Sequence, residues 1–192
     1  MIVWTIRQLH PHLDNLTILH CNGINQLDLF FRAAGASAAG ASNVIETHYA
    51  PNEPLGLMSS GTSNQDLTRL TFADETFDLA VHSETLEHLL DPEAALKEVL
   101  RVLKPGGRQM YTLPLIQSRR TRQRIGTDKQ GSRTQLLPPS FHGTDGEYPV
   151  VWEFGGDFLL ARSPHIERVF YDNYWLNPTV FTVVERKAGK VT

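Results

Sequence analysis

The sequence predicts an α/β domain with a mostly parallel sheet, helices on both faces and an antiparallel pair of strands at its C-terminal end. Two observations predict it. Short apolar strand-like runs alternate with amphipathic helical runs over residues 16–113, which is the order typical of a parallel sheet covered on both sides. The last two strand-like runs lie too close for a helical crossover and should pair antiparallel. With 192 residues, 41% of them hydrophobic, the chain suits a single domain over residues 1–192.

The first half of the chain supplies the clearest elements. A strand is expected at residues 16–20, followed by a helix over residues 24–34 with Leu27, Phe30 and Phe31 on one face. Further strands are expected in three runs, at residues 44–46, 64–67 and 77–82. Residues 51–63 are rich in Pro, Gly and Ser and predict a loop in place of a helix.

A second helix is predicted directly after Asp91, which can cap it, with Pro92 in the first position, where a missing N–H is harmless. Apolar side chains recur at helical spacing until the Lys-Pro-Gly-Gly turn at residues 104–107. The remaining expected elements are a strand at residues 108–113, a short helix at 154–161, and strands at 166–171 and 180–185. Residues 114–152 form a long connection, which is typical of a functional segment.

Composition and motifs exclude several classes of protein. The single cysteine, Cys21, rules out a disulfide within the chain, and no run approaches membrane-spanning length, so we expect a cytoplasmic protein without membrane contact. A net charge of −3 with dispersed Lys and Arg gives no reason to expect nucleic-acid binding. No dinucleotide, Walker A or hydrolase-elbow motif is present, and the histidine spacing predicts no metal site.

Polar and small residues follow the expected strands, at the edge where open α/β sheets bind ligands. These residues are Cys21, Asn22 and Gly23 after the first strand, Glu46 at the second, Asp66 and Leu67 at the third, and Ser83 after the fourth. A carboxylate at the second strand can accept hydrogen bonds from ribose hydroxyls, and one after the third can accept from an adenine amine. The set suits an adenosine ligand with a charged tail, although either acid could equally be a solvated residue or a helix cap.

Three quoted stretches carry a family resemblance. Residues 66–79 (DLTRLTFADETFDL), residues 83–89 (SETLEHL) and the helix with its Pro-Gly-Gly turn, residues 91–107, resemble type 11 class I S-adenosylmethionine-dependent methyltransferases. The resemblance implies a Rossmann-like, seven-stranded sheet with S-adenosylmethionine as cofactor. It implies that Glu46 holds the ribose, that Asp66 and Leu67 meet the adenine, and that His88 lies near the site. The alternative for His88 is a packing residue at the end of a helix. The residues beside the methionine part would be Cys21, Asn22, Gly23 and Ser83.

The sequence departs from that family in three places. The Gly-rich loop after the first strand is reduced to Gly23, although the neighbouring Asn22 can adopt some of the backbone angles that glycine allows. The chain starts close to the first strand, so helices that cover the site should be short or absent. The loop at residues 51–63 replaces a regular helix.

Acceptor contacts in this family fall in the segment after the fifth strand, so residues 114–152 are expected to form an acceptor or lid insertion. We single out His142 there as a candidate general base for a hydroxyl acceptor, against the alternative of a structural or solvated loop histidine. Arg122 and Arg124 could bind an anionic group of the acceptor, or form part of a solvated basic loop. Tyr111 could line the acceptor pocket or belong to the core.

Two functions remain open. The first is methyl transfer from S-adenosylmethionine to a small-molecule acceptor. The second is a methyltransferase-like binding or assembly module that has lost catalysis, which the sparse glycine loop favours. A nucleotide-binding oxidoreductase is disfavoured by the terminal strand pair and by the missing glycine fingerprint.

Overall fold

The computed structural model describes residues 1–21, 25–33, 44–142, 148–162, 164–171 and 179–189. The helices among them are α1 (Ile2–Leu9), α2 (Asn25–Ala33), η1 (Leu86–His88, a 3₁₀ helix), α3 (Pro92–Val102) and α4 (Gly156–Arg162). The strands up to the middle of the chain are β1 (Ile18–Cys21), β2 (Val44–His48), β3 (Met58–Ser59), β4 (Thr62–Asn64), β5 (Phe77–Ser83) and β6 (Leu103–Ile116). The later strands are β7 (Arg122–Gln123), β8 (Ile125–Thr127), β9 (Arg133–Gln135), β10 (Phe141–His142), β11 (Tyr148–Pro149), β12 (Trp152–Gly155), β13 (Ile166–Tyr171) and β14 (Thr179–Arg186).

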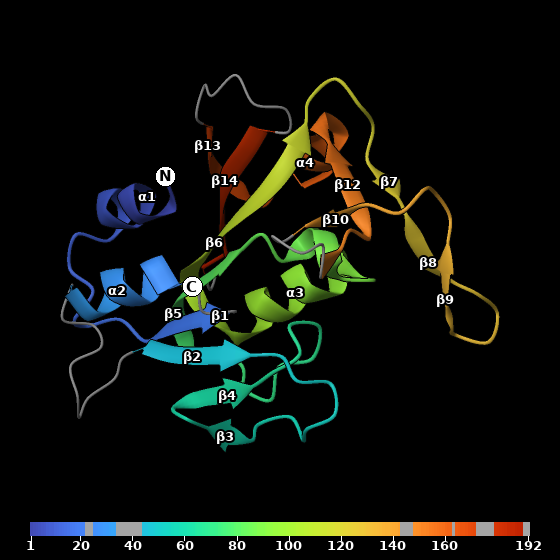
Figure 1. The fold of residues 1–192 in the computed structure, drawn as a ribbon. Helices are drawn as coiled ribbons and strands as arrows, with labels where there is room; N and C mark the ends of the chain where they lie inside the picture. The colour runs from blue at the N-terminus through green and yellow to red at the C-terminus, as the bar shows by residue number, and fades with distance from the viewer. Residues whose placement is uncertain (22–24, 34–43, 143–147, 163, 172–178, 190–192) are drawn as a thin grey trace.

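One large sheet organises the molecule (Figure 1), and within the described residues it runs in the order β13-β14-β6-β5-β1-β2-β4-β3. Strands β4, β2, β1, β5 and β6 are parallel, whereas β14 is antiparallel to β6 and to β13. The predicted parallel sheet with an antiparallel C-terminal pair is therefore confirmed. The described sheet has ten strands where the resemblance implied seven, because β3 extends the β4 edge and β12 and β7 add strands beyond β6.

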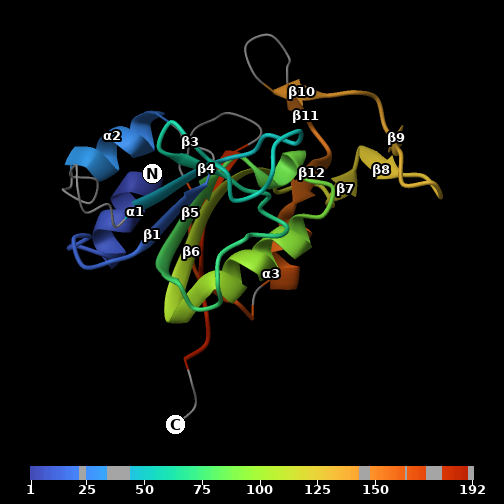
Figure 2. The ribbon, with the colours of Figure 1, turned by 90° about the horizontal axis from the view of Figure 1, so that it is seen from below.

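Helices cover both faces of this sheet, as predicted. Figure 2 shows α1 and α2 on one side and α3 on the other. The side chains of β5 alternate accordingly: Leu79 and Val81 pack in the apolar cluster that includes α1 and α2, whereas Ala80 between them packs in the cluster that includes α3. Phe77 joins the α3 cluster as well, because the strand register is irregular between Phe77 and Leu79. Because every second side chain faces the same way along a strand, one strand contributes to both halves of the core.

Helix α3 begins and packs as its sequence predicts. The Asp91 side chain accepts a hydrogen bond from the Ala94 amide at 2.8 Å, and Pro92 occupies the first turn. Leu96, Val99 and Val102 are fully buried against the sheet. Each such side chain contributes about 1.5–3 kcal/mol of burial free energy, so this face of the helix fixes its position on the sheet.

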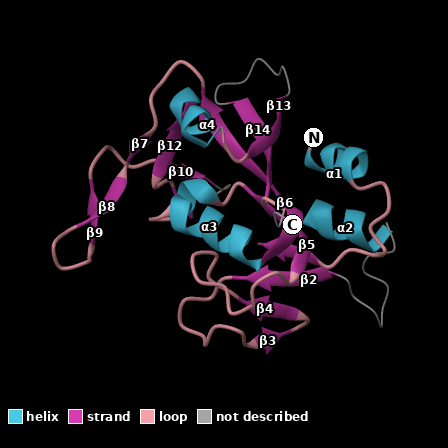
Figure 3. Cartoon of the chain, turned by 180° about the vertical axis from the view of Figure 1, so that it is seen from behind, coloured by secondary structure: helices cyan, strands magenta, loops and turns pink. Residues whose placement is uncertain are grey.

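Elsewhere the observed boundaries differ from those predicted. Strand β4 covers residues 62–64 in place of 64–67, because it forms a hairpin with β3 inside the expected loop. The Lys-Pro-Gly-Gly stretch lies within β6, where a φ of 81° at Gly106 accommodates the bend. Residues 154–155 belong to β12, which pairs with β6, so the short helix begins only at Gly156; Figure 3 shows α4 beside β12.

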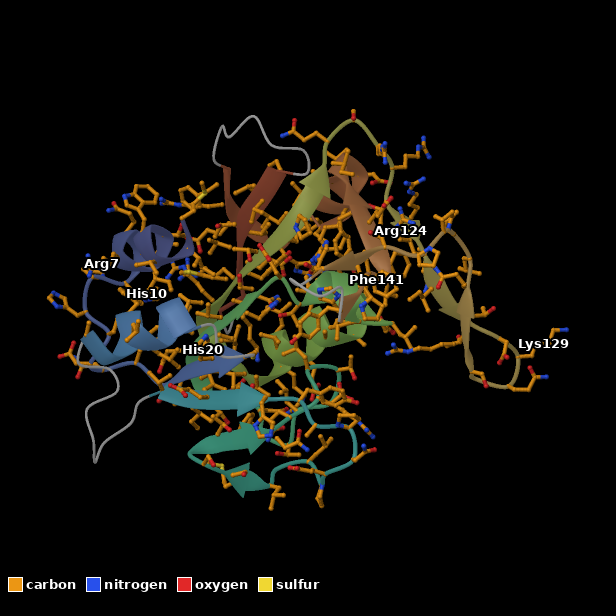
Figure 4. All side chains as sticks on the ribbon, viewed as in Figure 1. Arg7, His10, His20, Arg124, Lys129 and Phe141 are labelled. Carbon is orange, nitrogen blue, oxygen red and sulfur yellow. The ribbon has the colours of Figure 1, made fainter. Side chains whose placement is uncertain are left out.

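The described residues at 117–142 and 148–151 form short antiparallel strand pairs in place of an irregular connection. Strands β8 and β9 pair as an antiparallel hairpin that projects from the body of the molecule in Figures 1 and 2, and Lys129 lies at its tip in Figure 4. Strands β10 and β11 pair separately and lie near η1. No helix among the described residues combines the length and apolar character needed to cross a membrane.

Candidate functional site

The carboxyl ends of the parallel strands meet at one edge of the sheet, where most of the predicted cofactor residues lie. In the register of β1, His20 is paired with Glu46 of β2, and Cys21 is paired with His82 of β5. The chain runs outward from β1 through β2 to β4 and then returns to β5 on the other side of β1. This reversal of direction is the point where open α/β sheets bind ligands.

On β1, Cys21 is the last residue of the strand and is buried. Burial raises the pKa of its thiol to about 12, against a small opposing effect of a hydrogen bond with Thr47. The side chain is therefore a neutral thiol at physiological pH. Asn22 and Gly23, predicted to lie beside the methionine part of the cofactor, fall outside the described residues.

On β2, Glu46 is the third of five residues and is half-buried. The sequence placed it at the tip of a strand that ended there, but the strand continues to His48 and adds a parallel ladder to β4.

After β4, Asp66 is held by its own neighbours. Its oxygens accept from the Thr68 amide at 2.9 Å, the Thr68 hydroxyl at 2.7 Å and the Arg69 Nε at 3.0 Å. Burial works against ionisation of Asp66, but these hydrogen bonds outweigh it and hold the pKa of the carboxyl below its ordinary value. Leu67 is buried in the apolar cluster beneath α3. The acid is thus a fixed, ionised acceptor and the leucine a packing residue.

At the end of β5, Ser83 and the following residue are tied to β6. The Ser83 hydroxyl lies 2.5 Å from the Thr112 hydroxyl, which also accepts from the Glu84 amide at 3.1 Å. Glu84 has a φ of 47°, a left-handed conformation that is uncommon for residues other than glycine. This turn directs the chain from the strand into η1.

The segment after β6 returns to pack on η1. The Val151 amide donates to the Glu87 carbonyl at 2.7 Å, and the Trp152 indole donates to the Leu90 carbonyl at 3.3 Å. The His88 ring shares a hydrogen bond of 2.9 Å with the Pro149 carbonyl. These contacts bring His142 to His88, with ring centroids 5.2 Å apart. Two histidines singled out separately in the sequence are therefore neighbours in the fold.

Between these histidines lies Glu87, which sequence reasoning did not single out. Its side chain is fully buried, and neither carboxylate oxygen accepts a hydrogen bond from another described residue. Burial raises the pKa of Glu87 to about 8, a smaller effect of its own amide lowers it, and the charge of Glu84 raises it further. Its Oε1 lies 3.8 Å from His88 Nε2 and 3.7 Å from His142 Nδ1. The available signal was an acidic residue next to His88 within the leucine-rich run at residues 86–90 (LEHLL).

Known proteins resemble this chain in two ways: in the sequence of one segment and in the fold of nearly the whole chain. Residues 38–110 match the family described as Methyltransferase domain. A demethylmenaquinone methyltransferase of Mycolicibacterium paratuberculosis is 40% identical over 60 residues, covering 28% of this chain and 26% of that protein. Its counterpart in Streptomyces griseus is 54% identical over 43 residues, covering 22% and 19%. The match spans about a quarter or less of these relatives.

Solved structures extend the likeness over the whole chain. An S-adenosylmethionine-dependent methyltransferase from Mesorhizobium loti superimposes with a TM-score of 0.60 at 19% identity, covering 97% of this chain and 98% of that one. The chain has the class I methyltransferase fold. A 1,6-didemethyltoxoflavin-N1-methyltransferase from Burkholderia thailandensis, solved with S-adenosylhomocysteine, gives a TM-score of 0.56 at 13% identity, covering 97% and 78%. The resemblance to class I methyltransferases found in the sequence is confirmed.

In this methyltransferase fold, Tyr111 faces the core. It is fully buried, and its hydroxyl donates to Glu185 Oε1 at 2.8 Å. Gln109 Nε2 donates to the other Glu185 oxygen at 2.7 Å, and Arg162 binds the same carboxylate through Nε at 2.5 Å and Nη2 at 2.7 Å. The tyrosine therefore belongs to a buried polar network, which corresponds to the core alternative in the sequence analysis.

Arg122 and Arg124 bind a protein carboxylate in this fold. Both donate to Glu153 of β12, and Arg124 Nε does so at 2.8 Å. Burial opposes ionisation of Glu153, but these two guanidinium groups hold its pKa below the ordinary value. The pair of arginines fastens β7 and the start of β8 to β12; Figure 4 places Arg124 at the base of the projecting hairpin.

The described residues at the sheet edge fit an adenosine-type cofactor in their chemistry. Glu46 is half-buried, and the Asp66 side chain is 18% exposed, so both acids are partly shielded from water without being sealed in the core. Glu46 lies on β2 and Asp66 follows the neighbouring strand β4, both on one side of β1, whereas Ser83 ends β5 on the other side. Two shielded carboxylates and a hydroxyl match the hydroxyl and amine groups of such a ligand.

Proposed function

We propose that the chain transfers a methyl group from S-adenosylmethionine to a small-molecule acceptor. The observation that carries the proposal is the coincidence of a methyltransferase-family match at residues 38–110 with a methyltransferase fold along nearly the whole chain. A solved relative of that fold holds S-adenosylhomocysteine, which supports S-adenosylmethionine as the cofactor.

On the cofactor side, Glu46 accepts hydrogen bonds from the ribose hydroxyls, and Asp66 accepts from the adenine amine next to Leu67. Cys21, Asn22, Gly23 and Ser83 lie by the methionine part. The neutral state of the Cys21 thiol supports this assignment, because a thiolate at that place would itself be a competing methyl acceptor. His88 closes the site at the end of β5.

On the acceptor side, residues 114–152 form the insertion that covers the acceptor. The cofactor supplies an activated methyl group, so the protein's task is to align the acceptor with it and to exclude water. His142 takes the proton of a hydroxyl acceptor; its side chain is 38% exposed, which leaves its ring within reach of a bound molecule. Arg122 and Arg124 contribute to acceptor binding only with the guanidinium N–H groups that do not already donate to Glu153 or, for Arg124, to the Pro138 carbonyl.

The names of the curated relatives support a small-molecule acceptor. The aligned proteins in Mycolicibacterium paratuberculosis and Streptomyces griseus are demethylmenaquinone methyltransferases, and the structural relative from Burkholderia thailandensis holds 1,6-didemethyltoxoflavin. All are named for small molecules. We therefore propose a small organic acceptor in place of a protein or nucleic acid.

The second candidate is a methyltransferase-like binding module without catalysis. The engagement of Asp66 favours it, because three protein donors already occupy the carboxylate that would meet the adenine. An adenine amine must then share an oxygen with Thr68 or Arg69. Such a module binds its partners without turning over S-adenosylmethionine.

The test uses Glu46→Gln, which removes the charge at constant size, with Glu53→Gln as a control at an exposed acid. Affinity for S-adenosylhomocysteine should fall about tenfold or more in the first variant, since a hydrogen bond to a charged group contributes roughly 1.5–3 kcal/mol, and should be unchanged in the second. Equal affinities would remove Glu46 from the site. Turnover of S-adenosylmethionine with a panel of hydroxylated ring compounds then separates the enzyme from the non-catalytic module.

A further inference from the structure

Three side chains from two distant parts of the chain meet at η1. Glu87, His88 and His142 each offer one potential metal-ligand atom, and these atoms all lie within 4.8 Å of one another. Glu87 and His88 come from η1, which follows the end of β5, whereas His142 comes from the β10–β11 hairpin. Figure 4 shows Phe141, the neighbour of His142, beside this part of the fold.

The carboxylate of Glu87 needs a partner that the described residues do not supply. It is fully buried, and both of its oxygens lack a hydrogen-bond donor from another described residue. The two histidine nitrogens at 3.8 and 3.7 Å are too distant to donate effectively. An unpaired polar group in the interior costs free energy, and a buried acid is normally paired or bound to a metal. The burial of Glu87 without a donor therefore points to a bound ligand separately from the clustering of the three side chains.

The histidine beside it is already oriented as a metal ligand. A carbonyl oxygen only accepts hydrogen bonds, so the 2.9 Å contact with Pro149 means that His88 Nδ1 carries the proton and donates it. The lone pair of His88 then lies on Nε2, the atom nearest to Glu87. Metal-binding histidines commonly donate their other ring N–H to a backbone carbonyl in this way. The Val151 amide bonded to the Glu87 carbonyl fixes the backbone of the same turn.

We propose that Glu87 Oε1, His88 Nε2 and His142 Nδ1 form a three-ligand site for a divalent transition-metal ion of the Zn²⁺ type. A tetrahedral ion with ligands at 2.0–2.2 Å places its ligand atoms about 3.3–3.6 Å apart. The observed separations of 3.7 and 3.8 Å from the carboxylate oxygen are close to this range, and all three ligand atoms lie within 4.8 Å of one another. Two imidazoles and one carboxylate select a transition metal over Mg²⁺ or Ca²⁺, which prefer oxygen ligands.

Such a site has three protein ligands, which is the number found in catalytic zinc sites that keep a fourth position for water or a substrate oxygen. Its use in catalysis rests on the proposed function: an ion there would hold and polarise an acceptor oxygen, and His142 would then act as a ligand in place of a base. Metal binding at these three side chains does not depend on methyl transfer or on the identity of the acceptor.

The test is calorimetric titration of the whole chain with Zn²⁺, and separately with Mg²⁺. Wild type should bind one Zn²⁺ per chain and no Mg²⁺ at the same concentration. His142→Ala and the isosteric Glu87→Gln should weaken Zn²⁺ binding at least about 100-fold, since outer partners of metal ligands alone contribute roughly 10- to 100-fold. His12→Ala removes an exposed histidine elsewhere and serves as the matched control.

Thermal unfolding without metal shows whether each variant is folded, and the partly exposed position of His142 makes its replacement well tolerated. Zn²⁺ binding that is equal in wild type, His142→Ala and Glu87→Gln would overturn the proposal, as would the absence of a one-to-one site in wild type. Titration of wild type with S-adenosylhomocysteine is independent of both results. A chain that binds Zn²⁺ but no S-adenosylhomocysteine would keep the metal site and refute the proposed function, and the reverse result would do the opposite.

Discussion

Replacing Arg162 by methionine should lower the free energy of unfolding by about 3 kcal/mol. The guanidinium is 6% exposed and binds the fully buried Glu185 through two nitrogens. Removing one partner of a buried ion pair costs roughly 3–5 kcal/mol, because the other charge stays buried without compensation. Tyr111 and Gln109 continue to donate to Glu185, which places the expected loss at the lower end of that range. Arg162 also binds the Glu93 carboxylate, but this side chain is 49% exposed and is solvated at little cost once the guanidinium is removed.

The assay is urea unfolding followed by tryptophan fluorescence. Arg133→Met, at an exposed position on β9, is the control and should change stability by less than about 0.5 kcal/mol. In the double variant Arg162→Met/Glu185→Gln, the neutral amide no longer leaves a buried charge, so about 1 kcal/mol or more of the loss should be recovered. A loss below about 1 kcal/mol in Arg162→Met, or a double variant no more stable than the single one, would refute this reasoning.

Three further outcomes follow from the packing and charges. Gly155→Ala should cost about 1–3 kcal/mol, because its Cβ would lie 2.1 Å from the Arg119 carbonyl oxygen, whereas Gly189→Ala meets nothing within 4 Å and should be neutral in the same unfolding assay. Asp91→Ala should lose about 1 kcal/mol by uncapping α3, and Asp91→Asn should retain most of it; an equal loss in both would contradict a capping role. The pKa of Glu153 is held below its ordinary value of 4.5, so its ion pairs stabilise the fold above that pH and their contribution disappears as pH falls through the lowered pKa. The stability gap between wild type and Glu153→Gln should therefore be present near pH 7 and shrink as the pH falls below 4.5 and through the lowered pKa, and a gap that widens in acid would count against it.

The elements predicted well from the sequence are those whose signals are local. Helix α3 has its cap at Asp91, its proline at the first position and its apolar stripe within one stretch of chain, and it begins where these residues predict. Strand β5 is likewise a mostly apolar run with residues of both faces buried. Each of these patterns arises from residues close together in the chain, so no knowledge of tertiary contacts was needed.

The elements that differed depend on partners far away in the chain. Phe154 and Gly155 have a pattern compatible with a helix, but they pair with β6 and become strand β12, which no local signal indicates. The sequence made Arg124 a candidate for binding the acceptor, but it did not indicate that the guanidinium donates to Glu153 in the fold. Glu87 lies close to His142 because the chain returns to η1 and the Val151 amide bonds to the Glu87 carbonyl. This long-range contact is not indicated by the sequence near Glu87. The sequence indicates the chemistry of each side chain, but it does not indicate which side chains contact one another in the fold.

The measurement closest to the central claim is calorimetric titration of the wild-type chain with S-adenosylhomocysteine. Binding of one molecule per chain, abolished or weakened about tenfold or more in Glu46→Gln, is the expected result, because the ligand should occupy the carboxyl edge of β1, β2 and β5. The absence of heat and of any thermal shift at a ligand excess of roughly a thousandfold over a micromolar Kd would contradict it, since such an excess should stabilise a binding fold by about 4 kcal/mol.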